Sequence, residues 1–178
     1  SEKDLYSDIA KREIASILRC DLSLIISKFE IELLITTFKI DKALLYYDKS
    51  IKYNVTDPEV YANKGSIYYS QDKDSLALYE YNRALAINPN HLESLNGRGS
   101  VYGKFNKSDL AIADFSLAIT KDPTYQLSYK NRAAAYVLIK RYDDAINDYK
   151  KFMELNPDDV EAMVNMGAVY LNKGDINS

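Results

Sequence analysis

A period of 34 residues is the feature that most constrains this chain. Four tyrosines, Tyr68, Tyr102, Tyr136 and Tyr170, stand 34 residues apart. The same interval relates three further sets of positions: Gly65, Gly99, Ala133 and Gly167; Ala43, Ala77, Ala111 and Ala145; and Pro89, Pro123 and Pro157. A fixed period of this length predicts a stack of similar small units rather than one globular core. Such a stack offers a long curved surface and suggests a binding scaffold.

Each unit is predicted to consist of two helices, as the segment 92–125 illustrates. Residues spaced by three and four fall on one helical face in each half: Leu95, Gly99 and Tyr102 in the first, and Ala111, Phe115 and Ala118 in the second. Gly99 and Ala111 are small enough to let the two helix axes approach closely. Ser108 is expected to cap the start of the second helix, and Pro123 is expected to end it.

Composition narrows the function classes. The net charge of −3 and the pI near 5.3 argue against a protein that grips nucleic-acid phosphates. The apolar stretch 22–40 contains charged residues, so no membrane insertion is expected. The single Cys20 excludes an intramolecular disulfide and suits a cytoplasmic location. The single His91 lies in a turn without an evident partner, so we expect no catalytic residue, no metal site and no cofactor.

The unit resembles the tetratricopeptide repeat (TPR). That family places a large residue, glycine, tyrosine, alanine, an aromatic residue, alanine and proline at set positions. The pattern is met at Tyr61, Gly65, Tyr68, Ala77, Tyr81, Ala84 and Pro89; at Leu95, Gly99, Tyr102, Ala111, Phe115, Ala118 and Pro123; and at Tyr129, Ala133, Tyr136, Ala145, Tyr149, Phe152 and Pro157. Lys64, Arg98 and Arg132 depart from it, because the family has leucine there. The resemblance implies an all-α fold, a right-handed α-solenoid of antiparallel helix pairs.

The resemblance also suggests a domain organisation. Three complete repeats are expected at 58–91, 92–125 and 126–159, followed at 160–178 by the first helix of a truncated repeat. Upstream the pattern weakens, since bulky Ile31 stands where glycine is usual. We therefore expect a degenerate first helix pair at 22–57 and an N-terminal capping helix at 1–21, and the chain looks like a fragment.

In this family, the stripe of the first helix opposite the core lines a concave groove. Asn63, Asn131 and Asn165 keep the 34-residue register on this stripe, with Asn96 one residue out of step. Asparagine can donate and accept hydrogen bonds together, which matches the main chain of an extended peptide. An asparagine ladder is one interpretation; solvated asparagines that are simply common in the repeat are the other. The remaining candidate peptide-binding residues are Ser66, Tyr69, Ser100, Lys104 and Lys130.

Some family members clamp the acidic C-terminal tails of heat-shock chaperones between cations. Here Lys130 and Asn131 match the middle of that clamp, but Ser100 and Glu161 stand where asparagine and a cation belong. A chaperone tail is therefore disfavoured. The leading hypothesis is an adaptor or co-chaperone-like scaffold that binds an extended segment of another protein.

Two alternatives stay open at this point. The last helix is expected to expose Val164, Val169 and Leu171 or their neighbours, which would favour a homodimer through this helix. The chain would otherwise be the regulatory TPR region of a larger enzyme whose catalytic domain lies elsewhere.

Overall fold

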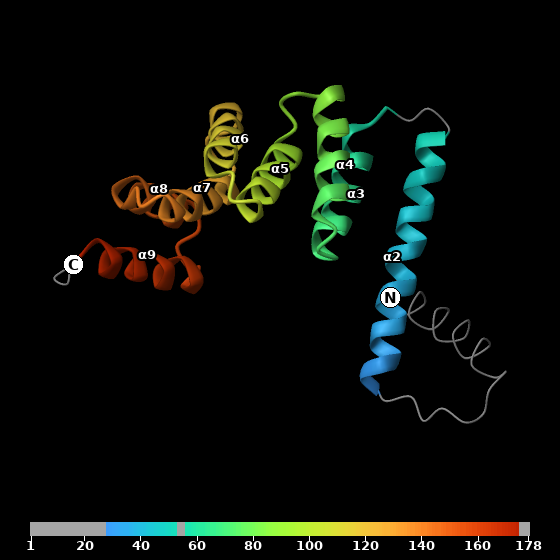
Figure 1. Ribbon diagram of the computed structural model, residues 1–178, viewed down its shortest axis with the longest axis horizontal. Helices are drawn as coiled ribbons and strands as arrows, with labels where there is room; N and C mark the ends of the chain where they lie inside the picture. The colour runs from blue at the N-terminus through green and yellow to red at the C-terminus, as the bar shows by residue number, and fades with distance from the viewer. Residues whose placement is uncertain (1–27, 53–55, 175–178) are drawn as a thin grey trace. The chain divides into compact units, whose positions relative to one another are not determined.

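The computed structural model describes residues 28–52 and 56–174. Within these residues the chain forms eight α-helices and no strand (Figure 1). None of the described helices is both long enough and apolar enough to cross a bilayer. The chain divides into two compact units, residues 1–55 and 56–178, and each is described by itself.

The described part of the first unit is a continuous helix, α2, from Lys28 to Lys52. The structure here differs from the helix pair predicted at 22–57, because no turn interrupts α2. The stretch between Phe38 and Ala43 contains neither glycine nor proline, so nothing in it breaks the helical backbone. The predicted capping helix at 1–21 lies outside the described residues.

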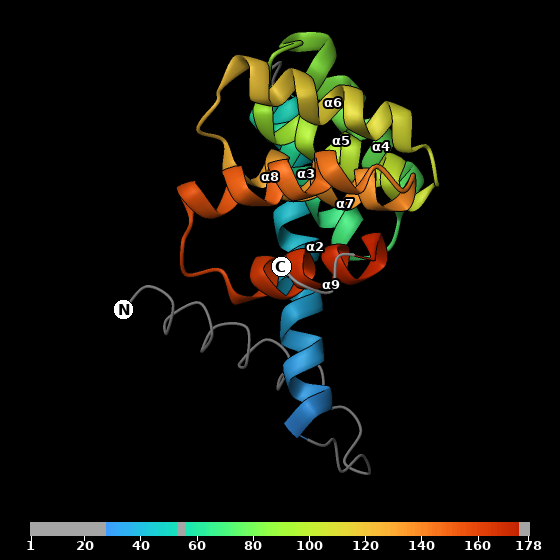
Figure 2. The same cartoon turned by 90° about the vertical axis from the view of Figure 1, so that its left-hand side faces the viewer.

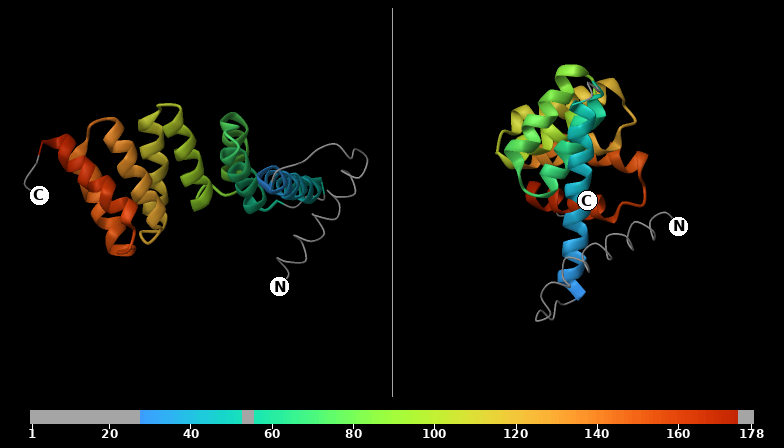
Figure 3. Two further views of the ribbon diagram at one scale, coloured as in Figure 1. Left: turned by 90° about the horizontal axis from the view of Figure 1, so that it is seen from below. Right: turned by 90° about the vertical axis from the view of Figure 1, so that its right-hand side faces the viewer.

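The second unit is a stack of helix pairs. Its helices are α3 (Pro58–Ser70), α4 (Asp74–Ile87), α5 (Leu92–Lys104), α6 (Ser108–Lys121), α7 (Gln126–Leu138), α8 (Tyr142–Leu155) and α9 (Val160–Lys173). α3 packs on α4, α5 on α6 and α7 on α8, and each pair also contacts the next helix along the chain. Seen from below, the helices form a row with α9 at its outer end (Figure 3, left). The predicted α-solenoid of helix pairs is confirmed.

Small residues set the spacing inside each pair. Ala77, Ala111 and Ala145 are completely buried. A Cβ atom placed on Gly65 would lie 2.7 Å from Cε1 of Tyr81, which is closer than real Cβ contacts allow. The ring of the second helix therefore occupies the space that a side chain on the first helix would need, as the small-residue pattern predicts.

The turns inside the pairs follow the same 34-residue interval. Asp72, Asn106 and Lys140 adopt left-handed backbone conformations with φ of 55°, 56° and 60°. The next amide in each turn bonds back to the first helix, as in Lys107 N–H donating to the carbonyl oxygen of Tyr102 at 2.9 Å. This closure makes Lys107 the residue before α6. The prediction that Ser108 caps α6 is wrong, because Ser108 is already the first helical residue and is buried.

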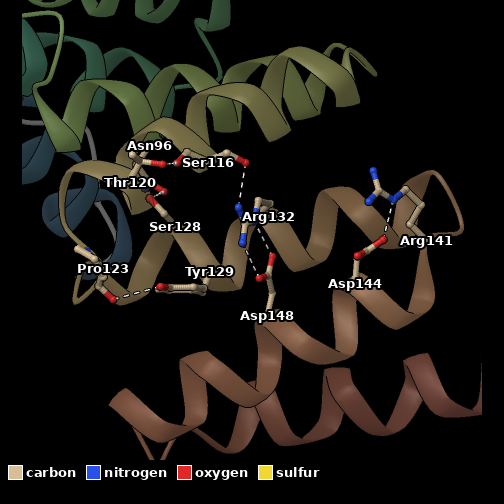
Figure 4. Close-up of polar contacts among 10 residues, drawn as sticks. All are labelled: Asn96, Ser116, Thr120, Pro123, Ser128, Tyr129, Arg132, Arg141, Asp144 and Asp148. Carbon is tan, nitrogen blue, oxygen red and sulfur yellow. Dashed lines mark hydrogen bonds and ion pairs between the residues drawn. The ribbon is translucent and has the colours of Figure 1, made fainter.

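The three residues that depart from the family pattern form buried or half-buried ion pairs. Lys64 lies 2.9 Å from Glu80, while Arg98 and Arg132 each bind an aspartate 16 positions later through two parallel hydrogen bonds of 2.7–2.8 Å. Figure 4 shows Arg132 between Asp148 and the hydroxyl of Ser116. Each of these three cations is therefore neutralised by the second helix of its own pair.

The terminal helix α9 lies below α7 and α8 in Figure 2. Val164 and Leu171 are exposed, as predicted, at 64% and 68%. Val169 was also expected to be exposed, and this is wrong: it is 2% exposed and belongs to the core cluster that contains Tyr149 and Phe152. α9 thus buries one face against α8 and leaves another uncovered by described residues.

Candidate peptide-binding groove

The first helices of the pairs form the inner side of the stack. α3 contacts α5, and α5 contacts α7, in addition to their contacts with second helices. A hollow of about 230 Å³ opens on this side between α3, α5 and α7. Four predicted binding residues line it, namely Tyr69, Ser100, Lys104 and Asn131, together with apolar Ala134 and Leu138.

Asn96 and Asn131 bond to each other beside this hollow. The Nδ2 of Asn131 donates to the Oδ1 of Asn96 at 3.0 Å. The hydroxyl of Ser128, drawn with Asn96 in Figure 4, donates to the same oxygen at 3.4 Å. Neither the Oδ1 of Asn131 nor the Nδ2 of Asn96 has a partner within 56–174, the part of this unit that the structure describes. The pair therefore presents one acceptor and one donor.

Gly97 explains why Asn96 is out of register. A Cβ atom on Gly97 would lie 2.3 Å from Cζ of Tyr81, so the tyrosine ring excludes any side chain at this position. The asparagine of this unit is consequently found one place earlier. Sequence reasoning missed the role of Gly97, although its place in the series of Asn63, Asn131 and Asn165 was a visible signal.

The two candidate lysines are held by acidic residues. The Nζ of Lys104 lies 2.8 Å from Asp72 and 3.0 Å from Asp74, and 4.2 Å from the centre of the Tyr69 ring. The hydrogen bond to Asp72, followed by that to Asp74, raises the pKa of Lys104. Lys104 is therefore a fixed positive charge at the edge of the hollow, with carboxylates beside it.

Lys130 is likewise engaged across the junction between α7 and α9. Its Nζ lies 2.7 Å from Glu161 and 3.4 Å from Asp159. The hydrogen bond to Glu161 is the main cause that raises the pKa of Lys130. An incoming carboxylate would have to compete with both of these acids.

The other predicted residues lie apart from the central hollow or make internal bonds. Asn63 donates to Glu59 at 3.2 Å, and Ser66 shares a hydrogen bond of 3.2 Å with the Tyr81 hydroxyl. The hydroxyl of Ser100 donates to the main-chain oxygen of Asn96 at 2.9 Å. Asn165 lines a second hollow, of about 240 Å³, together with Tyr149 and Val169. The structure thus brings Asn96 and Asn131 together, but not Asn63 and Asn165.

Comparison with known proteins agrees with this architecture. The family model for the TPR repeat matches residues 65–104 and 135–174. No curated protein matches the sequence. The solved first TPR domain of human RPAP3 is 26% identical, with a TM-score of 0.64 over 68% of this chain and 96% of that one.

Two further solved structures are similar. The first TPR of Spaghetti (RPAP3), bound to the HSP90 peptide SRMEEVD, is 25% identical, with a TM-score of 0.64 over 66% of this chain and 94% of that chain. MamA from Desulfovibrio magneticus is 20% identical, with a TM-score of 0.70 over 97% of this chain and 85% of its own length. The helices α3 to α9 therefore share the fold of the tetratricopeptide repeat, whose family model matches two stretches of them.

Proposed function

We propose that residues 58–174 form a protein–protein interaction scaffold that binds an extended segment of a partner protein along α3, α5 and α7. The observation that carries this proposal is the Asn96–Asn131 pair at the rim of the hollow. An acceptor and a donor side by side match the N–H and C=O groups of a peptide main chain. The HSP90 peptide bound to the similar TPR of Spaghetti supports a peptide as the class of ligand.

The lining of the hollow indicates which segment would fit. Tyr69, Ala134 and Leu138 contribute apolar surface to the lining. An apolar side chain of the ligand would enter here while its main chain bonds to the asparagines. An adaptor for neutral, extended segments fits better than a clamp for acidic tails, because Lys130 is already bonded to Glu161 and Asp159.

The test is a binding titration with a peptide selected from an array on the unmodified chain. The double variant Asn96→Ala/Asn131→Ala should bind about tenfold more weakly, because each lost hydrogen bond contributes about 0.5–1.5 kcal/mol. Asn147→Ala on the exposed surface of α8 is the matched control and should bind like the parent. Equal affinity of the double variant, with its helicity intact, would reject the role of the asparagine pair.

A second candidate function, self-association, rests on α9. Val160, Val164 and Leu171 are exposed by 64–69% and, with Gly167, are spaced by four, three and four residues. This spacing places them on one helical stripe of the kind that pairs with another helix. A second copy of α9 would cover this stripe. Sedimentation at increasing concentration should show dimers that Val164→Glu abolishes; a monomer throughout would exclude this candidate.

A further inference from the structure

We propose that Glu59, His91 and Glu93 bind a Zn²⁺ ion at the junction of the first two repeats. Glu59 lies in the first turn of α3, His91 immediately precedes α5, and Glu93 lies in the first turn of α5. The sequence alone offered His91 no partner. The fold provides two carboxylates, one of them 32 residues away along the chain.

The distances suit a small cation. The Nε2 of His91 lies 3.2 Å from a carboxylate oxygen of Glu59 and 3.7 Å from one of Glu93. All three donor atoms lie within 4.8 Å of one another. Zn²⁺ bound tetrahedrally at its usual distances separates its ligand atoms by roughly 3.3 Å. Small side-chain rotations would therefore bring three ligands to one ion, with water or a partner group as the fourth.

The ligands are also oriented by their neighbours. The Nδ1 of His91 lies 2.9 Å from the hydroxyl of Ser94, a side chain that is completely buried. When Nδ1 carries the proton and donates it to Ser94, the lone pair of Nε2 points toward the two carboxylates. Asn63 donates to the other oxygen of Glu59. Histidine ligands of zinc are typically fixed in this way through the ring nitrogen that does not touch the metal.

The corresponding junction two repeats later shows what is missing at this one. There Asp159 and Glu161 take the places of His91 and Glu93, and Lys130 supplies the positive charge between them. The position equivalent to Lys130 is occupied by Ala62, which is buried. An imidazole and two carboxylates therefore meet where the later junction has a lysine, and imidazole combined with carboxylate is a donor set that suits Zn²⁺.

A bound ion would join the start of α3 to the start of α5. Glu59 belongs to the first repeat, whereas Glu93 belongs to the second, so the ion would fix the angle between them. The same angle positions Asn63 relative to the rest of the inner face. This inference does not depend on the peptide-binding proposal, because the ligands are not those that line the central hollow.

The experiment uses the whole chain with any affinity tag removed and with Cys20→Ser, so that the thiol does not bind metal. Titration with ZnCl₂ by calorimetry should give one site per chain, and Zn²⁺ should raise the melting temperature. Because His91 is the only histidine, its imidazole ¹⁵N signals can be assigned without ambiguity. The Nε2 signal should shift on binding, whereas MgCl₂ should leave it unchanged.

Two ligand variants and a control decide the outcome. His91→Asn and Glu93→Gln should each abolish the calorimetric site, and the second keeps the test valid if the first unfolds. Ser94→Ala should weaken binding about tenfold, as loss of an orienting neighbour does in known zinc sites. Glu154→Gln, an exposed carboxylate on α8, should bind like the parent. Unchanged binding in both ligand variants, an equal response to Mg²⁺, or no stoichiometric binding would overturn the proposal.

Discussion

Helices α5 and α9 are the same element of the repeat in two different settings. Gly99 of α5 and Gly167 of α9 occupy equivalent positions. A Cβ atom on Gly99 would lie 2.6 Å from the ring of Phe115, whereas one on Gly167 would meet nothing within 4 Å in the described part of the chain. Glycine is thus required for packing in α5, whereas in α9 it lies on a surface that a larger side chain could occupy. The environment, rather than the residue type, decides what a repeated position contributes.

The polar position next to these glycines shows the same contrast. Arg98 of α5 forms a bidentate ion pair with Asp114, while the equivalent residue of α9 is Met166. Met166 packs against the apolar cluster around Tyr149 and Val169. A cation is therefore found in α5, where the second helix of the pair supplies an acid, and an apolar residue in α9, which packs mainly against α8 and has no such acid opposite it among the described residues.

The largest expected effect comes from converting α5 to the α9 pattern. Arg98→Met leaves the nearly buried Asp114 without its partner, which should cost about 3 kcal/mol of unfolding free energy. Met166→Leu in α9 should change it by less than about 1.5 kcal/mol. Urea denaturation measures both. Adding Asp114→Leu to Arg98→Met should recover most of the loss; similar values for the two single variants would contradict the contrast.

The two glycines should respond in opposite directions to the same substitution. Gly99→Ala forces a methyl group against the Phe115 ring and should cost about 1–3 kcal/mol. Gly167→Ala meets no such obstacle and should stabilise α9 by up to about 1 kcal/mol, because alanine has the higher helix propensity. Thermal melts of the two variants provide the comparison. A loss of stability in Gly167→Ala would mean that its surface is covered.

The ends of α7 and α9 offer a third comparison. Both continue into a left-handed residue, Lys140 with φ of 60° and Gly174 with φ of 86°. Side chains disfavour this conformation by about 1–2 kcal/mol, and glycine does not. Lys140→Gly should therefore raise unfolding free energy by up to about 1 kcal/mol. Lys140→Asn, which copies Asn106 of the preceding repeat, should change it in the same direction, and a decrease in both would show that Lys140 makes a compensating contact.

The smallest expected effects concern the residues that precede α7 and α9. Burial, and then the charge of Glu93, raise the pKa of Tyr125 to about 12. Because the neutral form is favoured in the fold, the stabilising contribution of Tyr125 is present below the unfolded pKa of about 10 and is lost as the pH rises toward 12. Tyr125→Phe should therefore lose less stability than the parent across this interval in pH-dependent melts.

Asp159 should act at the opposite end of the pH scale. The hydrogen bond from Ala162 N–H, assisted by Lys130, lowers the pKa of Asp159. Its contribution is present above the unfolded pKa of about 3.9 and is lost as the pH falls below that value. Asp159→Asn should reduce the fall in melting temperature as the pH is lowered below that value. It should leave the dependence of the melting temperature on alkaline pH unchanged. An altered dependence on alkaline pH would show that the two junctions are coupled.

Much of the fold was predictable because each helix pair is formed by residues that lie close together in the sequence. The 34-residue period, the small residues and the prolines predict the pairs between α3 and α8, and the structure confirms them. The exceptions are local too. Ser108 is not a cap because the left-handed Asn106 closes the turn one residue earlier. α2 is continuous because its sequence contains no residue that stops a helix.

Less of the candidate groove was predictable, because it depends on contacts between repeats. The spacing predicted a row of asparagines, but the ring of Tyr81 occupies the place of one of them and Asn96 bonds to Asn131 instead. The engagement of Lys104 by Asp72 and Asp74 joins residues about 30 positions apart. A repeat pattern gives equivalent positions but not the neighbours that face them.

The amino-acid sequence by itself determined the repeating unit, the faces that its helices bury and the fold class, since these follow from residue spacing within a few turns of helix. Only the tertiary structure decided which lysines and arginines are neutralised, which glycine is indispensable, and that His91 meets Glu59 and Glu93. Those outcomes depend on how neighbouring repeats approach each other, and that approach is set by side-chain packing between segments that are distant along the chain.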